Sequence, residues 1–183
     1  MDTRKLLQRA ESFDAADRPA GLLARLARAV TRNDTIARAL RGAWLGHPVH
    51  PILVTAPIGA WLSAAVLDAS GHRSAARQVI AFGLANVPAA VLAGLADYTD
   101  LDAPQRRVAV AHAVANAAAT SLVATSFGYR CAGRDGVGAL LNLAGLAATG
   151  AGGALGGHLA YAMGAGVRRF NPPFVRRPEP DAT

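Results

Sequence analysis

Histidine and aspartate are the residue types of this chain whose spacing could support chemistry, because they recur at the ends of long apolar stretches. The candidates are His47, His50, Asp97, Asp100, His112 and His158. Imidazole together with carboxylate suits Zn²⁺, Fe²⁺ or Cu²⁺, and two imidazoles on facing helices can hold a haem iron. Cys131 is the single cysteine, which excludes an internal disulfide and a metal site built from cysteines alone.

Four stretches that contain no charged residue must position these groups. They cover residues 42–67, 78–96, 108–129 and 136–167. A helix needs about 20 mostly apolar residues to cross the hydrocarbon core of a bilayer. A soluble amphipathic helix would show a charged face at helical period, and none of the four stretches does. The sequence therefore predicts an all-α integral membrane protein, a four-helix bundle of two hairpins.

The expected domain boundaries follow from the same pattern. Residues 42–167 form the four-helix membrane domain, with spans at about 49–67, 79–96, 108–128 and 137–164. Residues 1–41 form a basic segment whose amphipathic stretch, residues 20–32, we expect to lie as a helix on the membrane surface. Residues 168–183 are rich in proline and are expected to form an extended tail. Pro57 and Pro88 fall inside the first two spans, where kinks are expected.

The distribution of basic residues predicts the orientation. Nine of the nineteen Lys and Arg residues precede the first span and four follow the last one. Positive residues are retained on the cytoplasmic side of a membrane, so both termini are expected in the cytoplasm. The net charge of +7 is concentrated in the tails and favours an anionic membrane surface over nucleic acid as its partner.

With this orientation all four helices bring ionisable groups to the cytoplasmic face. Ionisable groups in a membrane are functional candidates by default, so we expect a layer formed by His47, His50, Asp97, His112 and His158. A faint internal repeat accompanies it, because the separation from His50 to Asp97 nearly equals that from His112 to His158.

The motifs around these residues resemble a known family. They are Gly46-His47-Pro48-Val49-His50-Pro51, Gly94-Leu95-Ala96-Asp97, Ala111-His112-Ala113 and Gly156-Gly157-His158-Leu159-Ala160-Tyr161. Over about residues 43–167 the chain is similar to the bacterial four-helix membrane proteins known as domain of unknown function 2231. The resemblance implies a membrane redox setting, because members are often encoded beside Rieske-type iron–sulfur proteins. It implies no settled activity, and a Rieske centre itself needs two cysteines.

Three interpretations of the polar layer stay open. The first is b-type haem held by His112 together with either His50 or His158. The second is a divalent transition metal bound by some of His47, His50, Asp97, His112 and His158, either for redox chemistry or as a metal-dependent hydrolase, with Asp97 or Asp100 able to orient an imidazole. The third is structural: the histidines are satisfied by polar partners, and the protein is a membrane anchor or scaffold.

Small residues on the last span indicate close helix packing. Gly152 and Gly156 are four apart, as are Gly153 and Gly157, and this spacing lets helix backbones approach closely. Packing within the chain is the simpler interpretation. A homo-oligomer formed through this glycine-rich fourth helix is the alternative.

Overall fold

The computed structural model describes residue 7 and residues 9–166, and every regular element among them is helical. A basic N-terminal layer contains η1 (Asp14–Ala16), α2 (Asp17–Val30) and α3 (Asp34–Leu40). The remaining elements are α4 (His50–Leu53), α5 (Thr55–Ala69), α6 (Arg73–Tyr98), α7 (Ala103–Cys131), α8 (Asp135–Gly157) and the π-helical turn η2 (His158–Ala162). The predicted tail at 168–183 lies outside the described residues.

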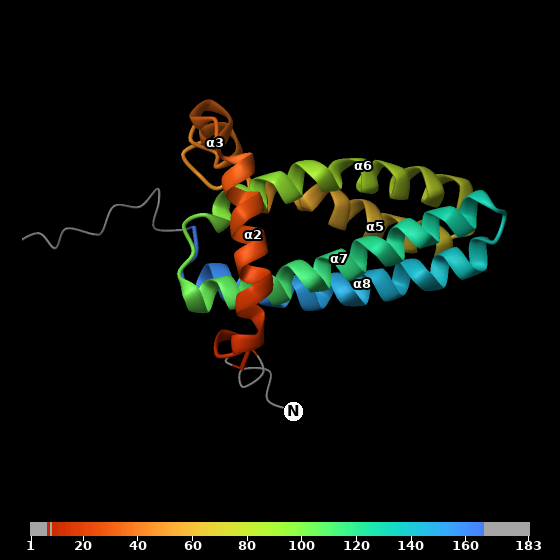
Figure 1. Ribbon diagram of the computed structural model, residues 1–183. Helices are drawn as coiled ribbons and strands as arrows, with labels where there is room; N and C mark the ends of the chain where they lie inside the picture. The colour runs from red at the N-terminus through yellow and green to blue at the C-terminus, as the bar shows by residue number, and fades with distance from the viewer. Residues whose placement is uncertain (1–6, 8, 167–183) are drawn as a thin grey trace, which may run out of the picture.

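Four helical stretches are long and apolar enough to cross a membrane, which confirms the predicted four-helix membrane bundle (Figure 1). They are His50–Ala69, Arg73–Tyr98, Ala103–Cys131 and Asp135–Ala162. At 1.5 Å per residue, α7 is about 43 Å long, whereas the hydrocarbon core of a bilayer is about 30 Å thick. The helices therefore extend beyond the charge-free stretches, and their charged ends reach the headgroup regions.

Local sequence signals set the helix ends. Asp102 and Gln105 form a capping box at the start of α7, in which each side chain accepts a hydrogen bond from the other residue's backbone. Gly133, with φ of +73°, ends the turn after α7, a conformation that favours glycine. Pro57 lies shortly after the break between α4 and α5, whereas α6 continues as one helix through Pro88. Connections of a few residues then force neighbouring helices to run antiparallel.

The two hairpins, α5–α6 and α7–α8, are structurally equivalent at an offset of 62 residues. Around the bundle α6 packs on α7 and α8 packs on α5, so α5 and α7 lie diagonally opposite each other. Three cross-bundle pairs sit at matching positions: His50 with His112, Trp61 with Val123, and Asp68 with Arg130. The glycines that make room match as well. A Cβ on Gly83 would lie 2.6 Å from Trp61, and one on Gly145 would lie 2.7 Å from Val123.

This register corrects the repeat seen in the sequence. His50 and His112 are indeed equivalent, but the equivalent of Asp97 is Leu159 and the equivalent of His158 is Ala96. The approximate 47-residue spacing had paired two unrelated hairpin ends. The repeat is carried by small and buried positions, and residue type alone did not reveal it.

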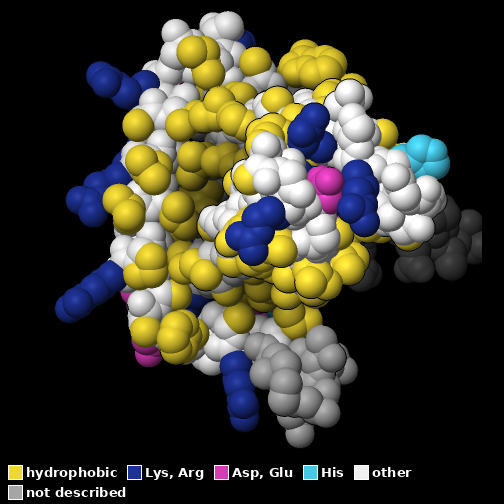
Figure 2. All heavy atoms as spheres, turned by 90° about the vertical axis from the view of Figure 1, so that its right-hand side faces the viewer, with side chains coloured by type: hydrophobic (Ala, Val, Ile, Leu, Met, Phe, Trp, Pro, Cys, Tyr) yellow, Lys and Arg dark blue, Asp and Glu magenta, His cyan; other side chains and the backbone are white. Residues whose placement is uncertain are grey.

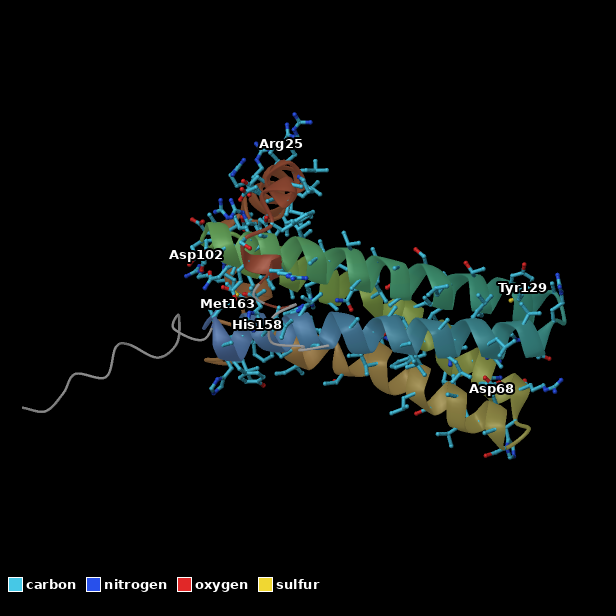
Figure 3. All side chains as sticks on the ribbon, turned by 90° about the horizontal axis from the view of Figure 1, so that it is seen from below. Arg25, Asp68, Asp102, Tyr129, His158 and Met163 are labelled. Carbon is cyan, nitrogen blue, oxygen red and sulfur yellow. The ribbon has the colours of Figure 1, made fainter. Side chains whose placement is uncertain are left out.

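A buried ion pair joins the hairpins at the end of the bundle opposite the N-terminal layer, where Figure 3 labels Asp68. Arg130 donates two parallel hydrogen bonds to the Asp68 carboxylate, at 2.8 and 2.6 Å. Its Nε donates to Ser126 Oγ at 3.2 Å, and Ser126 donates to the Gly138 carbonyl oxygen at 2.6 Å. The Arg130 side chain is fully buried. The span expected at about 108–128 ends before Arg130, which lies in the last turn of α7.

The basic N-terminal layer crosses the other end of the bundle, and α2 runs roughly perpendicular to the bundle axis (Figure 1). Tyr98 donates its hydroxyl hydrogen to the Ala20 carbonyl oxygen at 3.0 Å. Arg107 binds Asp17 through two hydrogen bonds and also contacts Asp14 at 2.8 Å. The hydrogen bond from Arg107 holds the pKa of the Asp17 carboxyl below its usual range. These contacts fix α2, close to the expected 20–32 stretch, to α6 and α7.

The equivalence of Asp68 and Arg130 predicts that their charges can be exchanged. Asp68→Arg or Arg130→Asp alone leaves two like charges facing each other in a buried position. Breaking such a pair costs about 3–5 kcal/mol. The double variant restores an opposite-charge pair across the axis and should recover much of the loss. Thermal unfolding of the four proteins in detergent micelles measures this, and a double variant no more stable than the single variants would contradict the equivalence.

Candidate functional site

The candidate site is the histidine pair, defined as His50 at the start of α4 and His112 about two and a half turns into α7. The two rings lie 6.4 Å apart, centroid to centroid, and are nearly perpendicular at 79°. Both side chains are half-buried. The pair occupies equivalent positions of the two hairpins, so each hairpin contributes one imidazole to the same central location.

Each imidazole is held in the same way by its own hairpin. His50 Nδ1 lies 2.8 Å from the Ala90 carbonyl oxygen on α6, and His112 Nδ1 lies 2.8 Å from the Gly152 carbonyl oxygen on α8. A carbonyl only accepts, so Nδ1 carries the hydrogen in both rings. In a neutral ring, this selects the tautomer whose lone pair lies on Nε2. Ligating histidines in metalloproteins are typically oriented by such a bond from the other ring nitrogen.

Glycines make the space in which the two rings lie. A Cβ on Gly94 would be 3.0 Å from His50 Cε1, and a Cβ on Gly156 would be 2.9 Å from His112 Cε1. Both distances are too short for ordinary contact, so only glycine lets the rings approach their partner helices this closely. Gly152 is equally restricted, because its Cβ would lie 2.6 Å from the Asn116 amide nitrogen. Two of the four glycines noted in the last span thus pack within the chain.

Asn116 lies next to His112 on the same face of α7, as their spacing of four predicts. Its amide nitrogen donates to the His112 carbonyl oxygen at 2.8 Å and lies 3.3 Å from the Nδ1 and 3.4 Å from the Nε2 of that ring. The amide is thereby held against the imidazole. This contact gives the α7 side of the histidine pair a polar neighbour that the α4 side, with Val54 at the equivalent position, does not have.

The other predicted ligands lie elsewhere. His158, in η2, pairs with Glu11 of the N-terminal layer, with Nε2 2.7 Å from Oε1. His47 is exposed in the turn before α4, and Asp97 is half-buried near the end of α6. Within residues 7 and 9–166, no group of three or more His, Cys, Asp or Glu side chains is arranged to hold a metal ion. The structure thus brings together two of the five predicted ligands.

Two parts of the site were not found from the sequence. Gly94 and Gly156 were noted only as family motif or packing residues, although both lie 44 positions after the histidine that they accommodate. Glu11 was not considered as a partner for His158, because the sequence did not show that the N-terminal segment reaches η2. The matching 44-residue spacing is the signal that could have revealed the glycines.

The glycine contacts predict a difference between neighbouring positions of α8. Gly156→Ala should displace the His112 ring and destabilise the bundle by about 1–3 kcal/mol, as overpacking does, and Gly94→Ala should do the same to His50. Gly153→Ala is the matched control: no atom lies within 4 Å of its Cβ, and alanine favours a helix over glycine by up to about 1 kcal/mol. Thermal unfolding followed by tryptophan fluorescence measures all three. Equal effects at Gly153 and Gly156 would contradict the proposed ring contact.

Comparison with known proteins supports the membrane assignment. No curated protein and no solved structure matched the chain. The family described as predicted membrane protein (DUF2231) matches residues 46–169, which is most of the chain and includes the histidine pair and all four membrane-spanning helices. The matched region begins after α2 and α3, so the basic N-terminal layer lies outside it. The chain therefore belongs to the DUF2231 family of predicted membrane proteins.

Proposed function

We propose that the protein is a membrane redox protein that holds b-type haem through the histidine pair. The observation that carries this proposal is the matched orientation of the two imidazoles. Each donates Nδ1–H to a carbonyl of its own hairpin at 2.8 Å, which leaves Nε2 as the basic nitrogen of both rings. The protein provides two imidazoles inside one end of a helical bundle, and four-helix proteins commonly build cofactor sites between facing helices.

The separation of the rings is compatible with a shared ion. Imidazole nitrogens bind first-row metal ions at about 2.0–2.1 Å, so two opposed rings on one ion have centroids roughly 6 to 6.5 Å apart. The observed separation is 6.4 Å. The glycines at 94 and 156 hold each ring close to its partner helix and thereby limit how far the rings can approach each other.

The number of ligands favours haem over a bare metal ion. A catalytic zinc site takes three protein ligands, and the described residues bring only two of the candidates together. Haem brings four equatorial nitrogens of its own and asks the protein for one or two axial ligands. The metal-dependent hydrolase has less support, because its metal ion would need a third protein ligand in addition to the histidine pair.

The residues around the pair would then tune a bound haem. Haem bound here would be held by His50 and His112 and would supply one-electron transfer. The carbonyls of Ala90 and Gly152 orient the imidazoles by accepting their Nδ1 hydrogens. Asn116 places an amide donor beside His112 alone, so the two ligands would not be identical. The electron-transfer partner that the family resemblance implies, a Rieske-type iron–sulfur protein, belongs to this proposal.

Haem binding is tested by titrating the purified full-length protein with hemin and recording its absorbance. We expect a Soret band that saturates at one hemin per chain and is lost, or reduced at least tenfold in affinity, in His50→Ala and His112→Ala. His47→Ala and His158→Ala are the matched controls and should bind like the unaltered protein, because these residues lie outside the pair. Circular dichroism verifies that each variant is folded.

Other outcomes of the titration would overturn the haem proposal. Absence of a saturable band, with folded protein, would favour the structural interpretation, in which the histidines only join helices. One zinc or copper ion per chain in elemental analysis, lost in His112→Ala, would favour a metal site. A band lost in His158→Ala but retained in His50→Ala would assign the ligands to a different pair.

We further propose that the protein lies in a bacterial inner membrane with both termini, and hence the histidine pair, on the cytoplasmic side. The support is the concentration of arginine in the N-terminal layer, which is retained on the cytoplasmic side by the positive-inside rule. A reporter enzyme that is active only in the periplasm should be silent when fused after Thr183 and active when inserted after Gly133. The reverse pattern would place the histidine pair at the outer face.

A further inference from the structure

We infer that α2 is an anionic-lipid binding helix: it docks on the phospholipid headgroups of the leaflet that surrounds the histidine end of the bundle. Three side-chain stripes of different character run along α2, and its position on the bundle brings two of them to the membrane surface. The inference does not depend on haem. It concerns a part of the chain that precedes the region shared with the family.

The first stripe fixes the helix to the bundle. Ala20, Ala24 and Ala27 are buried against α6 and α7, in clusters that contain Tyr98, Ala109 and Val110. Their spacing of three and four places them on one face of the helix. The small size of alanine lets the helix lie close against its neighbours. The orientation of α2 about its own axis is therefore determined, and so are the directions of the other stripes.

The second stripe is apolar and uncovered. Leu22 and Leu26, four residues apart, are 51% and 47% exposed, and Ala29 is exposed beside them. In Figure 2, which looks along the bundle from its far end, hydrophobic side chains cover the side of this layer that is turned toward the viewer. That side faces the membrane-spanning part of the bundle. An uncovered apolar stripe in that direction meets the acyl boundary of the bilayer.

The third stripe is basic. Arg18, Arg25 and Arg32 are spaced by seven and Arg28 flanks them, and all four are exposed. Figure 3 shows the Arg25 side chain projecting away from the bundle, and Figure 2 shows a row of basic side chains along the outer edge of the layer. Arginines beside an apolar stripe can extend to the headgroups while their stems stay in the interface. Basic residues near an anionic surface are attracted to its headgroups.

The position of α2 along the bundle axis agrees with binding to phospholipid headgroups. Ala109 and Val110, which α2 contacts, lie about 10 Å from the start of α7 at 1.5 Å per residue. A helix of about 43 Å that crosses a core of about 30 Å leaves roughly 7 Å of helix beyond the core at each end. The contact with α2 thus falls at the boundary between acyl chains and headgroups. The axis of α2 runs across the bundle, parallel to the membrane plane (Figure 1).

Lipid selectivity is measured by purifying the full-length protein in nanodiscs of equal phosphatidylcholine and phosphatidylglycerol, followed by native mass spectrometry of the lipids that stay bound. We expect phosphatidylglycerol to be enriched several-fold. Replacing Arg18, Arg25, Arg28 and Arg32 with Gln should abolish this enrichment, whereas replacing them with Lys, the charge-matched control, should retain most of it. Equal lipid retention by the Gln variant and the unaltered protein would overturn the inference.

A second measurement separates lipid from a protein partner and does not depend on the arginines. In a Cys131→Ser background, spin labels are attached at Leu22→Cys, Leu26→Cys and, as the matched control, Arg25→Cys. Labels at 22 and 26 should be relaxed more by oxygen, which partitions into lipid, and the label at 25 more by a water-soluble nickel complex. Labels at 22 and 26 that prefer the nickel complex, or that neither reagent reaches in native membranes, would contradict lipid docking.

Discussion

The bilayer core offers no water to hydrogen-bonding groups, and this constraint explains most polar contacts of the structure. A polar group inside the bundle must find its partner in the protein, because an unsatisfied one costs several kcal/mol in hydrocarbon. His50 and His112 therefore donate to helix carbonyls, Ser126 donates to Gly138, and Asn142 donates to the Trp61 carbonyl oxygen at 3.0 Å. In a chain with few side-chain acceptors, the backbone of a neighbouring helix is the acceptor most readily available. Reaching it requires small residues on that helix, which is why the glycines and the polar residues occur together.

The sequence was sufficient to predict the four membrane-spanning helices, because a long stretch without charged residues is itself a physical signal of burial in lipid. Any long stretch that lacks a charged face can be buried in lipid, and each of the four stretches overlaps a helix long and apolar enough to cross a membrane. The same criterion failed for Arg130. A charge-free window ends at the first charge, whereas Arg130 remains inside α7 because Asp68, on a helix 62 positions earlier, neutralises it. Local composition does not reveal a partner that is so distant in the chain. The expected span therefore ended before the residue that forms the ion pair.

The candidate site was predictable in part for a related reason. Hydropathy alone places His50 and His112 at one end of the bundle, because the ends of antiparallel helices must coincide, and the two rings lie 6.4 Å apart. Helical phase cannot say which of several groups at one end face each other, since that depends on how the hairpins are rotated. His158 illustrates the limit: it is at the expected end, but the N-terminal layer presents Glu11 to it at 2.7 Å. Contacts of that layer depend on tertiary packing, which no periodicity records.

The two equivalent hairpins are related by an approximate twofold axis along the bundle. This arrangement explains why the histidine pair and the ion pair lie where they do. A residue near the axis faces the equivalent residue of the other hairpin. Two identical side chains at such a position must pack together without repulsion, or the two hairpins must carry different residues there. Two imidazoles can face each other here, since each ring has a separate carbonyl for its Nδ1 hydrogen, and the same residue type is kept at both positions. Two like charges would repel each other, and positions 68 and 130 carry opposite charges. At the larger positions 61 and 123, a tryptophan faces a valine, because the centre of the bundle cannot hold two bulky rings. Equivalent residues thus meet in three ways along the axis: as two identical histidines, as a large and a small residue, and as two opposite charges. Only the pair of identical histidines leaves two lone pairs available for a ligand.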